Sequence, residues 1–269
     1  MEGEDYWRAV LLGEDKALKT MVRVLRSLPS APRCKLCMAP FEGPVAPLLK
    51  VIGFRRWPLN QQMCRFCVTS MEKQRGGAEV PVSLLFADVR GSTALAETLP
   101  PRDYVRTMDR FFHLVARAVD AEQGVIDHIV GDGVMAMWIP AFVGGDHARH
   151  AVAAGKNLAA RLRSSDTPGF FPAGVGVHTG VAYVGVVGEP GSYDFTVQGD
   201  VANTTARLGS AAAPGELVMS AAIAEEAGLD TGQLVHRRLD LKGKADPVAV
   251  WVDAPRGLDD GPAARRPPT

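Results

Sequence analysis

The spacing of apolar residues changes once along the chain, and this change divides it into two parts. In residues 1–30 apolar side chains recur at near-helical intervals, which predicts one or two amphipathic helices. The apolar stripe of such helices packs against its own domain or pairs with a second copy. From Val80 onward, alternating and continuous apolar runs are interleaved with helical stretches, which indicates strands and helices in alternation. A polar, glycine-containing stretch at 74–79 predicts a linker between the two parts.

The second part is predicted to form an α/β fold in which helices cover a mixed sheet. The apolar patterning predicts strands at 80–89, 125–130, 134–139, 172–187, 216–219, 234–241 and 247–252, and helices at 104–119, 146–163 and 201–212. A tight turn at 131–133 joins two of these strands into a hairpin, because its two glycines support positive φ angles. Such an alternation fits many folds, so function depends on individual residues.

Residues 169–188 contain no charged side chain and are long enough to cross a bilayer. They also contain six glycines and Pro172, which make a poor membrane-spanning helix. Apolar residues alternate with glycine at 173–178, as they do in a buried strand. We therefore expect a buried β-hairpin at this segment and no membrane span.

Composition and charge support two folded units. A chain of 269 residues with 46% hydrophobic content can bury one sizeable core and a small accessory module. Residues 1–77 carry 13 basic and 7 acidic side chains, whereas residues 78–269 carry 17 and 23. The whole chain is balanced at 30 of each, so no overall field indicates nucleic acid or an anionic membrane as a partner.

The expected boundaries follow from these changes in pattern. We expect a helical segment at 1–30, a cysteine-containing module with its linker at 31–77 and a larger domain at 78–253. The proline- and arginine-rich tail at 254–269 is predicted to be disordered. The first residues are acidic and lack a basic stretch followed by an apolar one, so we expect no secretory signal and a cytoplasmic location.

All four cysteines lie near the N-terminus in two CxxC pairs, Cys34 with Cys37 and Cys64 with Cys67. Two such pairs place four thiolates around one tetrahedral ion, which predicts a structural zinc site. An iron–sulfur cluster bound by the same thiolates is the alternative, whereas a disulfide is unfavourable in a reducing cytosol. The segment at 40–58 is rich in proline and glycine, so it is expected to be mostly loop and to depend on the metal for folding.

Two aspartates each end an apolar, strand-like run, and a helical stretch separates them. Asp88 lies in Phe-Ala-Asp-Val-Arg-Gly-Ser-Thr at 86–93, and Asp132 lies in Val-Gly-Asp-Gly at 130–133. Paired carboxylates suit two hard cations on a triphosphate. Either aspartate alone would also fit an ordinary turn residue.

Four ordered motifs make residues 80–253 resemble the class III adenylyl and guanylyl cyclases. The two aspartate motifs, at 86–93 and 130–136, are followed by Val-Gln-Gly-Asp-Val-Ala-Asn-Thr-Thr-Ala-Arg-Leu at 197–208 and Leu-Lys-Gly-Lys at 241–244. Four motifs in order are far more specific than any single one. The resemblance implies a ferredoxin-like catalytic domain that converts a nucleoside triphosphate to a 3′,5′-cyclic monophosphate and pyrophosphate.

The resemblance also implies two metal ions, which activate the attacking ribose hydroxyl and neutralise the leaving group. It assigns Asp88, Asp132 and the backbone carbonyl of Val89 as ligands of two Mg²⁺ or Mn²⁺ ions, which prefer oxygen ligands. It assigns the backbone amides of Gly91 and Ser92 to phosphate.

Asn203 and Arg207 lie four residues apart on a predicted helix and therefore share one face. The resemblance gives them the catalytic roles of orienting the ribose and stabilising the pentavalent phosphate. A fixed guanidinium suits the second role, because it can neutralise charge that develops only during the reaction. Lys242 matches the family's triphosphate-binding lysine, and Lys244 takes that role if the register differs.

Base selection is where the chain departs from the family pattern. His128 stands where adenylyl cyclases usually carry lysine and guanylyl cyclases glutamate. Thr196 stands where aspartate or cysteine is common, and it resembles a bacterial subclass with threonine there. The threonine favours ATP as substrate, with GTP second and pyrimidine triphosphates as a further alternative. A strand histidine that is satisfied by backbone groups is the alternative role of His128.

In the family the metal aspartates of one subunit face the asparagine and arginine of another, so the resemblance implies a homodimer with two equivalent sites.

One alternative function is a degenerate cyclase-like module that binds nucleotide as a regulatory scaffold; the complete set of motif residues favours an active enzyme instead. A nucleic-acid-binding cysteine module is a second alternative, for which basic and aromatic residues are too few. Because the cysteine module is joined directly to the catalytic domain, control of dimer geometry by metal or redox state is a further hypothesis.

Overall fold

The computed structural model describes residues 3–58, 60–73, 76–164, 171–189, 194–244 and 246–254. The helices are α1 (Gly3–Leu11), α2 (Lys16–Ser27), α3 (Ala46–Val51), α4 (Arg65–Lys73), α5 (Ser92–Thr98), α6 (Pro101–Ala121), α7 (Pro140–Val143), the 3₁₀ turn η1 (Gly144–Asp146), α8 (His147–Arg163), α9 (Asp200–Ala211) and α10 (Ala221–Glu226). The strands are β1 (Gly77–Val89), β2 (Val125–Val130), β3 (Gly133–Trp138), β4 (Ala173–Val187), β5 (Asp194–Gln198), β6 (Leu217–Ser220), β7 (Val235–Leu239) and β8 (Val248–Asp253).

These strands form one mixed sheet. Its order is β2-β3-β1-β4-β6-β8-β7, and β5 pairs with β4 beside this path. Neighbouring strands are antiparallel except β4 and β6, which run parallel. The prediction of a mixed α/β sheet with flanking helices is therefore confirmed, and β2 lies at the edge of the sheet.

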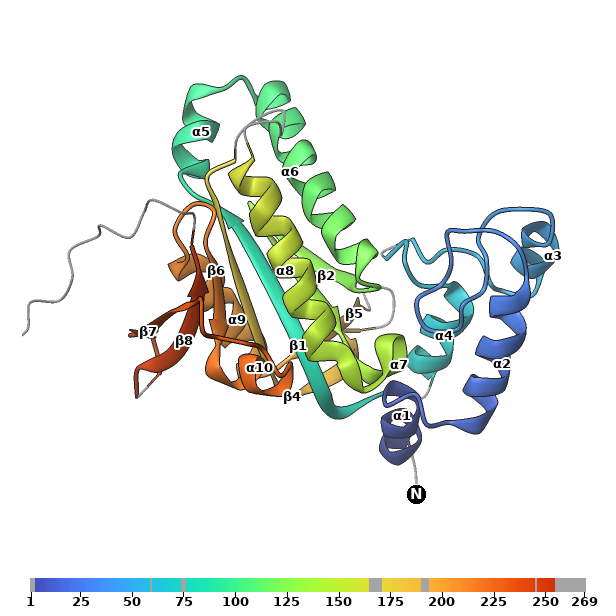
Figure 1. Cartoon of the computed structure of the whole chain (residues 1–269). Helices are drawn as coiled ribbons and strands as arrows, with labels where there is room; N and C mark the ends of the chain where they lie inside the picture. Colours follow the sequence, from blue (N-terminus) through green and yellow to red (C-terminus); the bar gives the residue numbers. More distant parts are fainter. Residues whose placement is uncertain are drawn as a thin grey trace, which may run out of the picture.

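Alternate residues of β1 face opposite layers, as the two-residue period of a strand requires. Val82 and Leu84 belong to a core that the sheet shares with the N-terminal helices and the start of α9. Leu85 and Ala87 belong to a second core beneath α6, α8 and α10. Figure 1 shows α8 crossing one face of the sheet, with α9 behind it.

Helix α9 lies against the centre of the sheet at a distance that leaves no room for a side chain. A Cβ on Gly176 of β4 would lie 2.1 Å from the backbone nitrogen of Gly209 on α9. A Cβ on Gly209 would in turn lie 2.7 Å from the carbonyl oxygen of Phe86 on β1. These glycines therefore set how closely the helix that carries Asn203 and Arg207 approaches β1 and β4.

The expected hairpin within 169–188 is wrong. The described part forms one strand, β4, which pairs with β1 over its length from Gly77 opposite Gly185 to Val89 opposite Ala173. Its hairpin partner is β5, which lies beyond the segment. Glycines of β4 instead allow close contact with neighbouring backbones: Gly185 lies against Gly77 of β1, and Gly176 lies against Gly209 of α9. In the described parts of the chain, none of the helices combines the length and apolar character needed to cross a membrane.

The N-terminal module begins with two amphipathic helices, α1 and α2. Asp15 caps α2, because its side chain accepts a hydrogen bond of 2.7 Å from the amide of Leu18. The segment at 40–58 is less irregular than expected, since it contains α3. The linker expected at 74–79 ends earlier, because β1 already begins at Gly77 and pairs with β4 from that residue. The predicted disordered tail lies, apart from Ala254, outside the described residues.

Candidate active site and cysteine cluster

The two motif aspartates meet at one end of the sheet. Asp88 near the end of β1 pairs with Gly133 at the start of β3, so the turn that carries Asp132 lies beside it. Burial raises the pKa of Asp88, and the negative charge of Asp132 raises it further. Two carboxylates that repel each other at a partly buried site fit a divalent cation with oxygen ligands. The donor set therefore suits Mg²⁺ or Mn²⁺.

Arg90 connects this pair to α9. Its Nη1 donates a hydrogen bond of 2.9 Å to Asp88 Oδ2, and its Nε donates to the carbonyl oxygen of Ala212 at 3.2 Å. It also donates to the carbonyl oxygen of Gly209. The guanidinium partly offsets the rise in the pKa of Asp88 and ties that side chain to the C-terminal end of α9.

Backbone amides lie next to the aspartates. Gly91 has a φ of +71° and precedes α5, of which Ser92 is the first residue. Apart from Gly91 itself and its two neighbours in the chain, no heavy atom of the described residues lies within 4 Å of the position that a Cβ on Gly91 would take. The first amides of a helix have no intrahelical acceptor. The Gly91 and Ser92 amides, two residues beyond Val89, therefore suit a phosphate oxygen.

His128 and Asn203 line one pocket. This pocket of about 460 Å³ is lined by His128 from β2, by Asn203 from α9, and by Phe86 and Met135 between them. Asn203 is exposed, whereas His128 is half-buried. The structure therefore brings together His128 and Asn203, which the sequence places far apart.

Asp127 is a site residue that sequence reasoning missed. Its side chain is 0% exposed, and its Oδ2 lies 2.8 Å from His128 Nδ1 and 3.1 Å from Thr196 Oγ1. The expected alternative for His128, satisfaction by backbone groups, is wrong because a carboxylate holds its ring. The sequence did contain a signal: Asp127 is an acidic residue within an apolar, strand-like run. A carboxylate in such a position is rarely buried unless a polar partner binds it.

Arg207 lies one helical turn beyond Asn203 and is half-buried. The β7–β8 turn lies over it, because a Cβ on Gly243 would be 3.2 Å from Arg207 Nη2. Lys244 in this turn forms an ion pair with Asp200 at the start of α9. Lys242 is exposed, and its assignment to the triphosphate stays a prediction.

The predicted residues thus form two groups. Asp88, Asp132 and the Gly91–Ser92 amides form one, and His128, Thr196 and Asn203 form the other. Among the described residues, no hydrogen bond or ion pair joins either aspartate to Asn203 or Arg207.

The four cysteines gather into one buried cluster. Their sulfur atoms all lie within 4.8 Å of one another. The Cys37 and Cys64 sulfurs are 3.6 Å apart, and the Cys64 amide donates a hydrogen bond of 3.3 Å to Cys34 Sγ. A tetrahedral zinc with bonds of about 2.3 Å holds its sulfurs about 3.8 Å apart. The four side chains therefore fit a zinc ion, and the same thiolates fit an iron–sulfur cluster.

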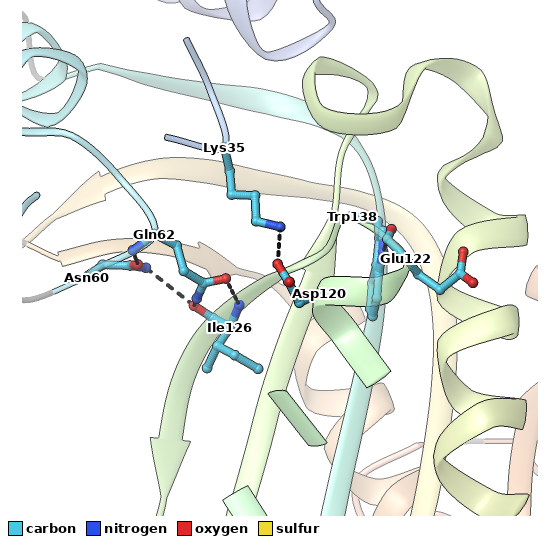
Figure 2. Close-up of polar contacts among 7 residues, drawn as sticks. All are labelled: Lys35, Asn60, Gln62, Asp120, Glu122, Ile126 and Trp138. Carbon is cyan, nitrogen blue, oxygen red and sulfur yellow. Dashed lines mark hydrogen bonds and ion pairs between the residues drawn. The ribbon is translucent and has the colours of Figure 1, made fainter. Parts of the chain in front are cut away.

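Figure 2 shows polar contacts of the cysteine module with Asp120 and Ile126 of the larger domain. Lys35, within the first CxxC pair, forms an ion pair of 2.7 Å with Asp120 at the end of α6. Gln62 both donates to the carbonyl oxygen and accepts from the amide of Ile126 on β2, each at 3.4 Å. Asn60 adds a hydrogen bond of 3.3 Å to the same carbonyl. The module thus pairs with the open edge of β2, directly before Asp127.

The fold and the two groups of residues define a nucleotidyl cyclase domain. The chain belongs to the class III cyclase family: residues 77–253 match the family described as the Adenylate and Guanylate cyclase catalytic domain.

Similar proteins include an uncharacterised protein, Rv1318c, of Mycobacterium tuberculosis, which is 31% identical over 198 residues covering 69% of this chain and 35% of that protein. Adenylate cyclase 1 of Rhizobium meliloti is 33% identical over 134 residues, covering 47% of this chain and 20% of that enzyme. The chain thus spans about a third or less of the length of these relatives.

Two solved structures share the fold. The guanylyl cyclase Cya2 matches with a TM-score of 0.61 and 28% identity, covering 68% of this chain and 98% of that one. The adenylyl cyclase CyaB of P. aeruginosa matches with a TM-score of 0.55, 26% identity and the same coverage. One of these enzymes is named for guanylyl and the other for adenylyl cyclase activity, so the fold is common to both activities.

Proposed function

We propose that the chain converts a nucleoside triphosphate, with ATP favoured, to the 3′,5′-cyclic monophosphate and pyrophosphate. The observation that carries this proposal is the pair of carboxylates, Asp88 and Asp132, whose mutual repulsion a divalent cation relieves. Family membership over residues 77–253 supports the same reaction type.

In this reaction the ribose 3′-oxygen attacks the α-phosphorus, the 3′-hydroxyl proton leaves, and the bond from the α-phosphorus to pyrophosphate breaks. Two Mg²⁺ or Mn²⁺ ions, when bound, acidify the hydroxyl and neutralise the leaving group. Asp88, Asp132 and the carbonyl of Val89 would hold these ions. The amides of Gly91 and Ser92 would donate hydrogen bonds to phosphate oxygens.

The second group of residues acts on the nucleoside and the developing charge. Asn203 lines the same pocket as His128 and is suited to orient the ribose of a bound nucleotide. Arg207 would stabilise the pentavalent phosphate, since its guanidinium lies in a half-buried position on α9 and can neutralise charge that develops during the reaction. Lys242, in the exposed turn beside it, would bind the triphosphate.

The proposed active site is shared by a homodimer, in which the metal-binding group of one copy faces the Asn203–Arg207 group of the other. Membership of the class III cyclase family supports this arrangement. Two equivalent sites would then form across the two-fold axis, and a single copy would be inactive.

Thr196 supports ATP as the substrate, because it resembles the bacterial subclass that carries threonine there, whereas His128 matches neither the lysine of adenylyl cyclases nor the glutamate of guanylyl cyclases. GTP or a pyrimidine triphosphate is the alternative substrate. A degenerate regulatory module is the alternative function, which the Asp88–Asp132 pair disfavours, because a module without catalysis has no need of repelling carboxylates.

We further propose that Cys34, Cys37, Cys64 and Cys67 hold a structural metal, zinc or an iron–sulfur cluster. Elemental analysis and the visible spectrum of the purified protein distinguish the two, because zinc is colourless and clusters absorb visible light. Loss of metal in Cys34→Ser, with unchanged metal in Ser70→Ala of the same module, is the expected result.

The central experiment supplies the purified chain with Mn²⁺ and each of the four nucleoside triphosphates in turn. Mass spectrometry then identifies the products. We expect a 3′,5′-cyclic monophosphate, with the highest kcat/KM for ATP. No cyclic product from any triphosphate, in a sample shown to be dimeric and metal-loaded, would instead support the degenerate module.

A further inference from the structure

The outward face of α3 is apolar, although this helix lies on the surface of the N-terminal module. Its inward residues, Ala46 and Leu49, are buried. Leu48, Val51 and Ile52 are 68%, 84% and 58% exposed, and their spacing places them on one side of the helix. A helix that is apolar all round is typical of a protein interior. The exposed side of α3 therefore indicates a contact surface.

Phe66 at the start of α4 extends this surface. Its amide donates a hydrogen bond of 3.0 Å to the carbonyl oxygen of Gly53, which directly follows α3 and its C-cap. Phe66 is 42% exposed, and its ring stacks on buried Phe54 with 4.8 Å between the ring centroids. Contiguous exposed apolar residues mark interaction sites, whereas single ones are ordinary. We call these four side chains the apolar tip: Leu48, Val51, Ile52 and Phe66.

Basic side chains lie beside the apolar tip. Residues 43–71 contain four basic residues and no acidic one. Lys50, Arg55 and Arg65 are exposed and form no ion pair among the described residues, whereas the fourth, Arg56, is paired. The amide of Arg65 donates to the carbonyl oxygen of Arg55 at 2.8 Å, so these two residues are neighbours. The three free cations favour an anionic partner.

The apolar tip lies at an outer end of the molecule. Figure 1 shows α3 at the end of the N-terminal module that is away from the sheet. Residues 1–77 carry 13 basic and 7 acidic side chains, whereas residues 78–269 carry 17 and 23. The module stays positive even when four thiolates around one zinc ion add a net of two negative charges. A negatively charged surface would therefore attract the molecule with this end foremost.

An anionic lipid surface fits both properties of the apolar tip. Apolar side chains enter the boundary between headgroups and acyl chains, while lysine and arginine side chains reach the headgroup phosphates. A second copy fits less well, because a two-fold contact through the same face would place the free cations of one tip against those of the other. Like charges that face each other across an interface oppose binding.

We propose that the apolar tip and its three free cations bind the chain to the surface of membranes that contain anionic lipids. The four apolar side chains enter the lipid, and the cations contact headgroup phosphates. The inference goes beyond the proposed cyclase reaction and does not depend on it, because lipid binding requires no nucleotide.

Co-sedimentation of the metal-loaded full chain with vesicles tests the proposal. Vesicles of phosphatidylcholine and phosphatidylserine in equal amounts are compared with vesicles of phosphatidylcholine alone. We expect binding to the mixed vesicles to be at least about tenfold stronger, because each cation near an anionic surface contributes about fivefold. Added salt should weaken this binding, since it screens charges at the surface.

The double variant Leu48→Gln with Val51→Gln tests the apolar tip itself. Both side chains are exposed, so the metal content and the melting temperature should stay as in wild type. We expect the affinity for mixed vesicles to fall at least about tenfold, because apolar area that enters the lipid is lost. Val105→Gln is the matched control, because Val105 is a valine on α6 of the larger domain that is 55% exposed. Its affinity should stay within about twofold of wild type.

Equal binding of wild type and the double variant, an equal loss in Val105→Gln, or no preference for phosphatidylserine would overturn the inference. Failure of the wild-type chain to bind either vesicle would also overturn it, and a lower dimer content of the double variant in analytical ultracentrifugation would then assign the tip to a contact between two copies. Where the double variant loses its metal or melts lower, Lys50→Glu decides: it retains the apolar tip, and the inference requires that binding to mixed vesicles weakens at least about fivefold.

Discussion

At the scale of single residues, the candidate site depends on carboxylates in unusual surroundings. Asp88 and Asp132 repel each other, and Asp127 is buried with one oxygen unpaired among the described residues. Such arrangements reduce stability unless a ligand or a positive charge compensates, which is typical of functional sites. Activity and stability should therefore respond in opposite directions when one of these charges is removed.

Asp132→Asn tests whether activity and stability respond in opposite directions. Removing the charge of Asp132 relieves the repulsion that raises the pKa of Asp88, so the metal-free variant should melt no lower than wild type. The same change removes a metal ligand, and kcat should fall at least about 100-fold. Scanning calorimetry and a cyclase assay measure the two effects. A clear loss of stability would indicate that Asp132 has a structural role instead.

His178 predicts a pH dependence of stability. Burial lowers its pKa to about 4, and the nearby positive charge of Lys244 acts in the same direction. Histidine in the unfolded chain titrates near 6.5. The stability provided by neutral His178 is therefore complete above pH 6.5 and is lost as the pH falls toward 4, by about 2 kcal/mol between pH 7.5 and pH 5.

Urea unfolding at the two pH values measures this loss. His178→Gln, which retains a polar group for the hydroxyl of Ser220 at 2.7 Å, should lose correspondingly less between them. His113→Gln changes an exposed histidine and should behave as wild type does. An equal loss in wild type and His178→Gln would assign the acid sensitivity to other groups.

At the scale of elements, the edge strand β2 joins the cysteine module to the pocket that is lined by His128 and Asn203. Its register shifts between Ile126 and His128, and Gln62 and Asn60 from the module bind Ile126 at this irregularity. An open strand edge carries unpaired backbone groups, and the Gln62 amide satisfies two of them much as a neighbouring strand would. The module therefore stabilises the strand that presents Asp127 and His128.

Gln62→Ala should loosen this edge. Without the side chain, the Ile126 amide loses its acceptor and should exchange its hydrogen faster. The free energy of opening measured by this exchange should fall by about 1 kcal/mol. Amide exchange followed by NMR or mass spectrometry measures the change. Gln61→Ala is the control, because the hydrogen bonds of Gln61 within the described residues go to carbonyls of its own module, those of Trp57 and Pro58. Equal exchange at Ile126 in wild type and Gln62→Ala would show that the contact contributes nothing.

At the scale of the whole molecule, the proposed active site needs two copies of the chain. A mixture of Asp88→Ala and Arg207→Ala chains should recover up to about a quarter of wild-type activity, since half the dimers are mixed and each has one intact site. A mixture of Asp88→Ala and Asp132→Ala chains should recover none, because every site lacks one aspartate. Activity assays on mixtures shown to contain heterodimers distinguish a shared site from a site within one chain.

The sequence predicted much of this architecture because secondary structure follows local periodicity. The two-residue alternation of β1 and the helical spacing of α6, α8 and α9 are local patterns, and the structure has these elements at nearly the predicted bounds. The 169–188 segment was misjudged because glycine marks both turns and close contacts. A glycine at a close contact is recognised only when the backbone that packs against it is known.

The sequence by itself determined the family, because four ordered motifs name the residues of the site. The tertiary structure decided how they are grouped. Asp127 and Thr196 are 69 residues apart, yet β2 and β5 bring them within 3.1 Å and enclose the carboxylate between them. Burial and pairing depend on such distant contacts, which no local pattern records. Reaction type could therefore be predicted from motifs, whereas the buried carboxylate that contacts both His128 and Thr196 was visible only in the fold.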